Sequence, residues 1–525
     1  MTITSLPFLG FNILAVLLFL IFPVKYRWIS LLISSIAFYW IALSSKPIIV
    51  FIFITSLTTW LAARKMEEMK TALDEELKAP GLDKAAKKQL KANAQAKRKT
   101  VLMAALVGNI GILVVLKLFN YFTDAFAMLA GIFMGTGGAS AVRLIMPLGI
   151  SYYTFATIGY LLDIYWKRYE AEQNYARFLL FAIYYPHIMQ GPISRYPKLG
   201  AELKKPELRL RWNNFVVGME SIVLGCFKKL VIADRAGIFV SETLKASGMK
   251  GGVYLLALVL DAIQIYADFS GYMDIVSGVS KLFDVELEQN FNHPFLAKSV
   301  PEFWRRWHMS LGSWFKDYVY YPLTMSRTVK DLNKKAKNLK SPHLKTVIAV
   351  IIPVMVTWLL TGLWHGTGKG YVAWGIYYGT LITISVTFEA DVQNILKKLQ
   401  VNTECFSYRL FQTIKIFCIF MGGRFLGTPM GMAHRLEIFK SIRHPIELDL
   451  LQYGLTQSDF LVLLMGVIVL IAIAAIEVKE NIFSWLNRQN KIFCAIVLYI
   501  FMFAVLLLGI YGTTYDSSNF MYQQF

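Results

Sequence analysis

Charged residues are scarce in this sequence. They make up 17% of its 525 residues, while 56% are hydrophobic, and a soluble globular chain carries about 25% charged residues. Cysteine is also rare: the four cysteines, Cys226, Cys405, Cys418 and Cys494, are scattered and lack the paired spacing of a metal or redox site. The composition excludes a soluble globular protein and predicts a polytopic membrane protein, in which the cysteines are small hydrophobic side chains.

The first apolar run, residues 7–22, lacks a basic leader and a small-residue cleavage site. We therefore expect a retained first span and not a signal peptide. At roughly 20 residues per spanning helix, the apolar runs leave room for about ten or eleven spans. We expect a single all-α integral-membrane domain over residues 1–525, built as a helical bundle, with no soluble catalytic domain.

Acidic residues are the minority charge: 34 Asp and Glu stand against 54 Lys and Arg, a net charge of +20. The basic residues gather between apolar runs, mainly in residues 64–100, 195–211 and 326–345. This is the pattern of cytoplasmic loops and not of a nucleic-acid-binding surface. We expect 64–100 to be a charged helical loop and 326–345 a basic linker, both cytoplasmic. Counting spans then places the C-terminal tail, 512–525, outside.

One apolar region is interrupted. Residues 184–192, YYPHIMQGP, contain two prolines and a glycine, which break a straight helix. Non-helical backbone at membrane depth is tolerated where it is buried in protein or lines a cavity. We expect a re-entrant segment that lines a cavity, with His187 as a candidate substrate-binding residue.

Carboxylates also occur inside an apolar run. Asp261, Asp268 and Asp274 lie within residues 253–283. Acidic side chains in a span are costly and usually face the bundle interior or a wet cavity. We expect Asp268 and the nearby Ser270 to organise such a cavity through hydrogen bonds.

Two histidines lie in tryptophan-rich apolar surroundings: His308 follows Trp307, and His365 follows Trp364. Histidine gives and takes protons near neutral pH, so this region is where we expect chemistry. From the residues alone, a structural histidine within a helix bundle stays the favoured interpretation. No third ligand is placed by spacing, so we expect no metal.

Two arginines, Arg305 and Arg306, precede Trp307. Arg suits phosphate recognition, so they are candidates for binding the phosphates of coenzyme A. An equal alternative is that they anchor the chain at the membrane interface.

Several stretches together resemble the membrane-bound O-acyltransferases, in the branch that contains alginate O-acetyltransferase. They are MPLGISYYTFATIGYLLDIY (146–165), PHIMQGPISRY (186–196), DFSGYMDI (268–275), NFNHPFLAKSVPEFWRRWHMSLGSWFKDYVYYPL (290–323) and GLWHG (362–366). The resemblance implies a helical bundle with a central tunnel in the bacterial inner membrane, with His365 as the catalytic residue and His308 as the second required histidine. It also implies acetyl-CoA as the donor, an extracytoplasmic polysaccharide acceptor and an SGNH-type extracytoplasmic transferase as partner.

The last six residues, FMYQQF (520–525), resemble the Phe-x-Tyr-x-x-Phe tail of these machineries. That resemblance implies that Tyr522 receives the acyl group and relays it outward. The charge pattern places the tail outside without using the resemblance.

Four functions stay open at this point. The first is O-acetylation of an alginate-like or cellulose-like exopolysaccharide or of peptidoglycan. The second is D-alanyl transfer of the teichoic acid type. The third is transport of a polysaccharide or lipid-linked sugar, with the intramembrane Asp and His residues as a proton relay. The fourth is a scaffold subunit, in which the histidines are dispensable.

Overall fold

The structure is a computed structural model. It describes residues 2–43, 45–134, 147–245, 252–366, 368–428, 430–442, 444 and 450–511, and the backbone alone within 120–134. Over these residues the regular structure is helical, and the only β contact is the isolated bridge between Phe291 and Trp307. The predicted all-α fold class is confirmed.

The chain forms two compact units. The first comprises Met1–Phe215 and Val279–Glu288, and the second comprises Val216–Gly278 and Gln289–Phe525. The helices of the first unit are α1 (Leu6–Ile21), α2 (Arg27–Ala42), α3 (Val50–Glu76), α4 (Lys84–Met134), α5 (Ile150–Tyr165), α6 (Tyr175–Ile183), α7 (Tyr185–Ile188) and α8 (Ala201–Leu203), with the short turns η1 (Val24–Tyr26), η2 (Lys46–Ile49) and η3 (Tyr196–Gly200).

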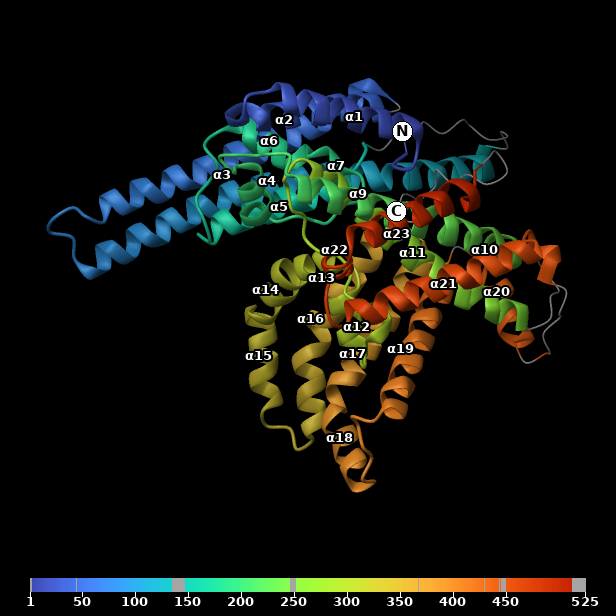
Figure 1. Cartoon of the computed structure of the whole chain (residues 1–525). Helices are drawn as coiled ribbons and strands as arrows, with labels where there is room; N and C mark the ends of the chain where they lie inside the picture. The colour runs from blue at the N-terminus through green and yellow to red at the C-terminus, as the bar shows by residue number, and fades with distance from the viewer. Residues whose placement is uncertain are drawn as a thin grey trace. The chain divides into compact units, whose positions relative to one another are not determined.

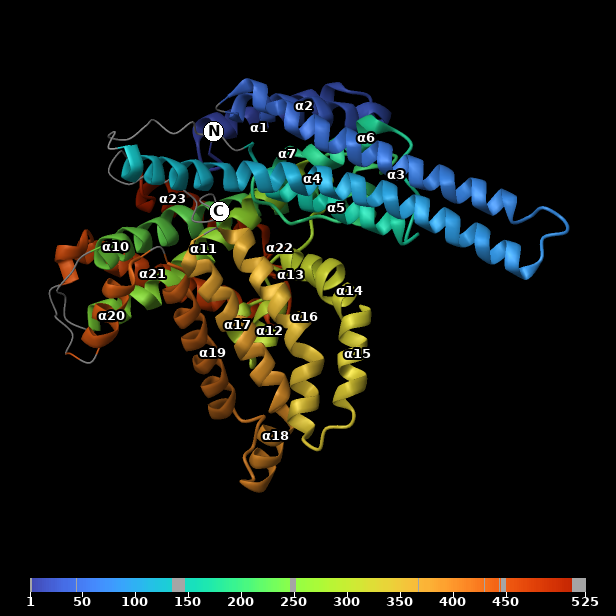
Figure 2. The same cartoon turned by 180° about the vertical axis from the view of Figure 1, so that it is seen from behind.

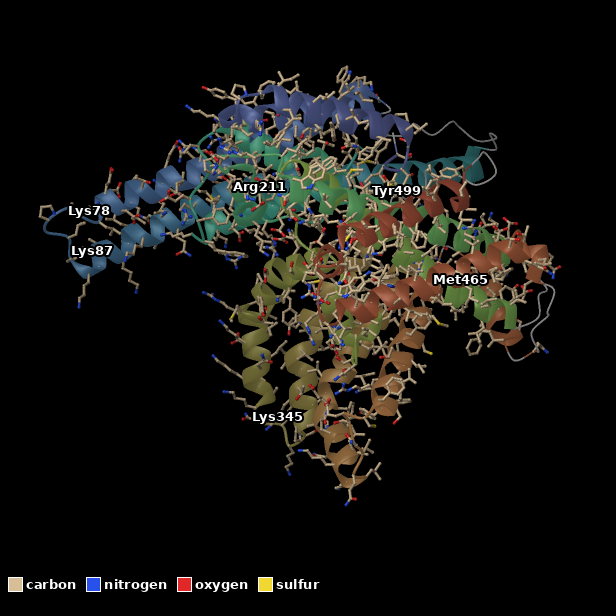
Figure 3. The ribbon with its side chains drawn as sticks, viewed as in Figure 1. Lys78, Lys87, Arg211, Lys345, Met465 and Tyr499 are labelled. Atoms are coloured by element: carbon tan, nitrogen blue, oxygen red, sulfur yellow. The ribbon has the colours of Figure 1, made fainter. Side chains whose placement is uncertain are left out.

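Helices α3 and α4 lie side by side as a long hairpin (Figures 1 and 2). A polar contact ties them together within their apolar halves, because Asn109 Nδ2 donates to Thr59 Oγ1 at 2.7 Å. Lys78 and Lys87 lie near the tip of the hairpin (Figure 3). The charged residues expected to form a loop thus lie largely on the two helices and the turn that joins them.

The interrupted segment of the first unit is buried. Helix α6 ends at Ile183, and only the short α7 follows it. Tyr185 anchors the break: its hydroxyl donates to Asn12 Oδ1 at 2.8 Å, and its backbone N–H donates to Ser35 Oγ at 3.1 Å. The bond to Ser35 gives the Tyr185 backbone N–H the partner that a continuous helix would supply, as a buried backbone requires.

The second unit contains the remaining helices, with most of α9 and α11. They are α9 (Trp212–Cys226), the π-helical η4 (Phe227–Ala233), α10 (Asp234–Lys245), α11 (Gly252–Leu282), η5 (Pro294–Leu296), α12 (Val300–Arg306), α13 (Met309–Phe315), the π-helical η6 (Lys316–Tyr320), α14 (Tyr321–Thr324), α15 (Arg327–Ala336), α16 (Pro342–His365), α17 (Lys369–Thr387), α18 (Glu389–Lys398), α19 (Phe406–Gly427), α20 (Met432–Ser441), η7 (Leu450–Tyr453), α21 (Gln457–Glu477), α22 (Ile482–Asn487) and α23 (Lys491–Leu508).

Small residues let the helices of the second unit approach closely. Helices α16 and α17 pack against each other in both views (Figures 1 and 2). A Cβ on Gly362 would lie 2.4 Å from the backbone oxygen of Tyr371, and one on Gly375 would lie 2.7 Å from that of Trp358. Such glycine contacts are typical of membrane helix pairs. This packing holds the end of α16, where His365 lies.

Seven helices within the described residues are long and apolar enough to cross a membrane, or eight if the bent pair of α17 and α18 counts as one span. Three further apolar helices, α1, α2 and α5, have 16 residues each. A helix of that length is about 24 Å long, short of the roughly 30 Å hydrocarbon core. The polytopic character is confirmed, and the count of ten or eleven spans stays a prediction.

Candidate active site

His308 and His365 line the same cavity. The cavity lies within the second unit, has a volume of about 580 Å³ and is walled mainly by α12, α13, α16 and α17. Its aromatic wall comprises Trp304, Trp307, Trp358 and Trp374, and its charged side chains are Arg305 and Lys316. Two histidines that lie far apart in the sequence thus face one largely apolar space.

The chain turns sharply at His308. Helix α12 ends at Arg306 and α13 begins at Met309, and His308 between them has φ of 45°, in the left-handed region. A non-glycine residue rarely adopts this conformation, and such residues cluster at functional sites. The turn buries the imidazole, which is 3% exposed, at the cavity wall.

A short extended segment supports this turn. The backbone N–H of Asn292 donates to the carbonyl of Arg306 at 2.9 Å, and the N–H of Met309 donates to the carbonyl of Asn290 at 3.0 Å. Beside the imidazole, His308 Nδ1 lies 3.3 Å from Asn290 Oδ1. The ring of Phe269, from α11, meets the imidazole edge to face at a centroid distance of 4.8 Å. Asn290 is a site residue that the sequence reasoning missed.

His365 is the last residue of α16, and Gly366 ends the helix. The imidazole is 7% exposed and packs against aromatic rings: its centroid lies 4.8 Å from that of Trp364 and 5.2 Å from that of Trp374. The Trp364 ring also lies 6.0 Å from the His308 ring. One indole therefore contacts both imidazoles.

A smaller cavity, of about 30 Å³, adjoins His365 and shares Trp304, Trp307 and Trp374 with the larger one. Its charged member is Arg424 of α19. Arg424 donates through Nε and Nη2 to the two carboxylate oxygens of Asp261, at 2.8 Å each. Such a bidentate pair has a fixed geometry, so it holds α11 and α19 together beside His365.

The other acidic residues of α11 pair with lysines of η4. Lys229 Nζ lies 2.6 Å from Asp268 and 2.8 Å from Asp234, and Lys228 Nζ lies 2.7 Å from Asp274. These carboxylates face the protein interior. Asp268 and Ser270 are buried but do not line the 580 Å³ cavity in the described part of the chain.

The remaining candidates are not among the described residues that line this cavity. Arg306 pairs with Glu302 at 2.7 Å, one helical turn away. His187 belongs to the first unit, where its Nδ1 lies 2.7 Å from the Tyr184 carbonyl oxygen. Tyr522 lies outside the described residues. The structure therefore brings together His308, His365, Trp364, Trp307 and Arg305, out of the residues singled out in the sequence.

Burial sets the protonation state of His308. Desolvation lowers the pKa of its imidazole to about 3, because a buried cation loses its hydration. His308 is therefore neutral at physiological pH, with an unprotonated nitrogen on its ring. Among the described residues no group of three His, Cys, Asp or Glu side chains is placed to hold a metal ion.

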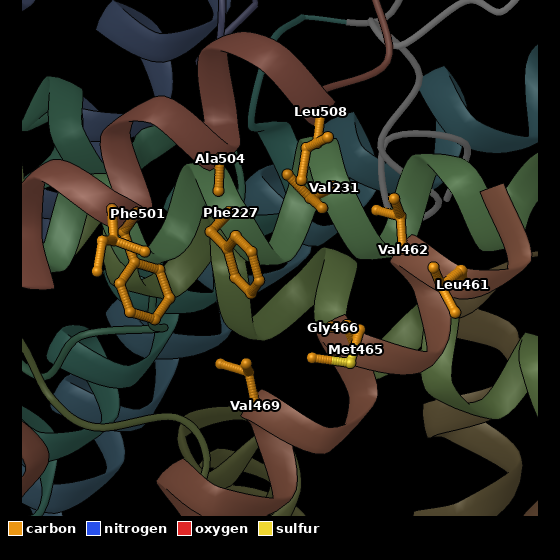
Figure 4. A pocket seen from close by; sticks show the side chains of 11 residues that line it. Phe227, Val231, Leu461, Val462, Met465, Gly466, Val469, Phe501, Ala504 and Leu508 are labelled. Carbon is orange, nitrogen blue, oxygen red and sulfur yellow. The ribbon is translucent and has the colours of Figure 1, made fainter. Parts of the chain in front are cut away.

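A separate cavity of about 280 Å³ lies between η4, α21 and α23 (Figure 4). Its lining is apolar, with Phe227, Met465 and Phe501 among the larger side chains. It offers no group for acid–base chemistry, so the 580 Å³ cavity is the candidate active site.

Residues 171–339 match the model of the membrane-bound O-acyltransferase family. The chain is 29% identical over 290 residues to the probable alginate O-acetylase AlgI of Pseudomonas syringae pv. tomato, covering 55% of this chain and 50% of that protein. It is 28% identical to the peptidoglycan O-acetyltransferase of Helicobacter pylori, covering 54% of each chain. It is 32% identical to the teichoic acid D-alanyltransferase of Streptococcus thermophilus, covering 45% of this chain and 56% of that protein.

The chain spans about half the length of the curated relatives it matches. The matched family segment includes His308 and the Asn290 segment. These bacterial relatives, together with the spanning helices, identify a multi-pass protein of the bacterial inner membrane. Residues 171–339 thus match the membrane-bound O-acyltransferase family, and about half of the chain is similar to alginate O-acetylases.

Proposed function

We propose that this protein is a membrane O-acetyltransferase, which takes an acetyl group from cytoplasmic acetyl-CoA for O-acetylation of an extracytoplasmic polysaccharide. The observation that carries the proposal is the shared cavity of His308 and His365. The similarity to alginate O-acetylases and to a peptidoglycan O-acetyltransferase supports the reaction class and favours an exopolysaccharide or peptidoglycan as acceptor.

Acyl transfer to a hydroxyl needs a base for the hydroxyl proton and an acid for the leaving thiol. In the proposed step the hydroxyl oxygen attacks the thioester carbonyl, a C–O bond forms and the C–S bond breaks. His365 takes the hydroxyl proton and passes it to the departing sulfur. His308, neutral on the same cavity, orients the acceptor or assists that proton transfer.

Arg305 is suited to binding the acyl donor, acetyl-CoA. Its side chain lines the cavity with Lys316, and a guanidinium matches phosphate geometry. We assign the two side chains to the phosphates of acetyl-CoA. Trp307 then forms part of the apolar wall for the acyl group, and Trp364 packs against the two imidazoles.

Tyr522 is the proposed intermediate carrier. Its phenol oxygen would be the first acceptor, forming an aryl acetate ester as the thiol leaves. An SGNH-type extracytoplasmic transferase would then move the acetyl group to a sugar hydroxyl and return the phenol. The tail motif and its expected outside location support this order.

D-alanyl transfer is the second candidate, favoured by the similarity to teichoic acid D-alanyltransferases. The same histidines would act on an aminoacyl thioester held by a carrier protein. This donor differs from acetyl-CoA, so a direct assay separates the two functions.

The test incubates purified full-length protein in nanodiscs with acetyl-CoA labelled in the acetyl group, without acceptor. Release of CoA and label on the protein are followed for wild type, His365→Ala and Tyr522→Phe. His343→Ala is the matched control, because His343 lies at a half-exposed position against Asp391. We expect His365→Ala to slow CoA release by about 10²- to 10⁴-fold and His343→Ala to leave it unchanged.

Label lost in Tyr522→Phe supports the relay. CoA release that needs His365 but labels no residue keeps the transferase and removes the relay. Full CoA release in His365→Ala overturns the proposed role of that residue. Turnover with a D-alanyl carrier protein but none with acetyl-CoA establishes the second candidate instead.

A further inference from the structure

The orientation of the Asn290 amide is fixed by its neighbours. The backbone N–H of Ser310 donates to Asn290 Oδ1 at 3.0 Å, and the Ser310 hydroxyl donates to the same atom at 2.8 Å. A backbone N–H can only donate, so the atom that faces it is the amide oxygen and not the amide nitrogen. On the other side, Asn290 Nδ2 points to the sulfur of Met273, 3.3 Å away.

This orientation determines which nitrogen of His308 carries the proton. His308 Nδ1 lies 3.3 Å from the same Asn290 oxygen. Two acceptors do not share a hydrogen bond, so Nδ1 must be the protonated nitrogen. A neutral imidazole carries one ring proton, and the basic lone pair is then on Nε2.

The Asn290 side chain is held on several sides. It is 2% exposed, its backbone carbonyl accepts from Met309, and the adjacent Phe291 bridges to Trp307. Met273 and Phe269, both on α11, pack against the amide and the imidazole respectively. The contact is therefore built from α11, α13 and the extended segment together.

We propose that Asn290 is a positioning residue, which fixes the Nδ1–H tautomer of His308 so that Nε2 is the basic nitrogen in acyl transfer. The catalytic part of this proposal rests on the proposed function. The charged and titratable groups on the cavity wall are Arg305, Lys316, Tyr320 and His365. Asp268, beside Phe269 on α11, is paired with Lys229.

The tautomer can be read without activity. Full-length protein with ¹⁵N-labelled histidine in nanodiscs gives separate imidazole signals for Nδ1–H and Nε2–H forms, and His308→Gln assigns the His308 signal. We expect wild type to show Nδ1–H. Asn290→Asp keeps an oxygen acceptor and should keep Nδ1–H. Asn290→Leu removes the acceptor and should give a mixture of tautomers.

The kinetic readout separates positioning from folding. We expect Asn290→Leu to lower kcat by about 10- to 100-fold, by analogy with the loss of a residue that orients a metal-binding histidine, with KM for acetyl-CoA little changed. Asn290→Asp should recover most of kcat and move the acidic limb of the pH profile upward, because a carboxylate favours the imidazolium. Asn109→Leu is the matched control, a buried amide of α4 in the first unit.

An Nε2–H signal for His308 in wild type would overturn the proposal. So would an Asn290→Leu variant with the wild-type tautomer and kcat. If Asn290→Leu does not fold, the spectra of wild type and Asn290→Asp still decide the tautomer. An Nδ1–H signal in a protein that transfers no acyl group would overturn the proposed function while supporting the hydrogen bond.

Discussion

At the scale of single residues, the burial of His308 lowers the stability of the folded protein at low pH. The imidazole packs against the Phe269 and Trp364 rings, which cannot hydrate a positive charge. Burial lowers the pKa of the folded-state imidazole to about 3, against about 6.5 in an unfolded chain. Between these two values the unfolded chain binds a proton that the folded chain does not, so acidification favours unfolding.

We therefore expect His308→Gln to weaken the loss of stability that wild type shows between about pH 7.5 and about pH 5. The measurement is the apparent unfolding temperature of the purified protein at both pH values. His343→Gln, at a half-exposed position, serves as the control and should behave as wild type. Equal acid sensitivity in wild type and His308→Gln would show that His308 accepts a proton in the folded protein.

At the residue scale, the sequence indicates candidates where a residue type and its local neighbours suffice, and the roles of these candidates stay predictions. His308, His365, Arg305 and Trp307 line one cavity, as the tryptophan-rich setting and the family resemblance suggested. The partner of Asp268 was not predicted. Lys229 lies 39 residues away, and pairing it with Asp268 requires the relative rotation of two packed helices, which apolar runs do not specify.

At the scale of elements, the pair of α16 and α17 sets the position of His365. Its contact depends on the absence of side chains at Gly362 and Gly375. A larger residue there would push the helices apart and move the end of α16 relative to α12 and α13. The histidine and the opposite cavity wall would then separate.

Gly375→Leu tests this packing. We expect it to lower the free energy of unfolding by about 1–3 kcal/mol, the usual cost of overpacking, and to reduce acyl transfer further than stability alone explains. Gly111→Leu on α4 is the control, because a Cβ at that position would have no neighbour within 4 Å. Denaturant titration in mixed micelles measures the free energy of unfolding of both variants. Equal stability of the two variants would contradict a tight α16–α17 contact.

The sequence indicates where helices lie more closely than it indicates where a helix departs from regular α-helical geometry. The apolar runs at residues 346–363 and 371–388 of the sequence correspond to α16 and α17. The π-helical turn η4 lies within residues 214–233, a largely apolar stretch of the sequence. A π-turn adds a residue to one turn of a helix, and here it coincides with the buried pairs of Lys228 and Lys229. Those tertiary contacts have no signal in hydrophobic periodicity.

At the scale of the whole molecule, the membrane explains both the exposed apolar side chains and the uneven distribution of charge along the chain. Large apolar side chains of α1, α21 and α23 are exposed, for example Leu6, Leu461 and Leu507. In water these surfaces would aggregate, whereas lipid covers them without cost. The excess of Lys and Arg behind the net charge of +20 then indicates the orientation of the protein in the membrane, since Lys and Arg accumulate on the cytoplasmic side.

Single cysteines test the orientation of the protein in the membrane. In a variant whose four cysteines are replaced by serine, single cysteines are placed by Lys88→Cys, Lys340→Cys and Ser518→Cys. Lys88 and Lys340 are exposed in the two basic segments, and Ser518 lies in the tail that carries Tyr522. We expect a membrane-impermeant maleimide to label Ser518→Cys in spheroplasts, and the other two after permeabilisation alone. The reverse pattern would place Tyr522 on the side of acetyl-CoA, and an outward acetyl relay through that tyrosine would be impossible.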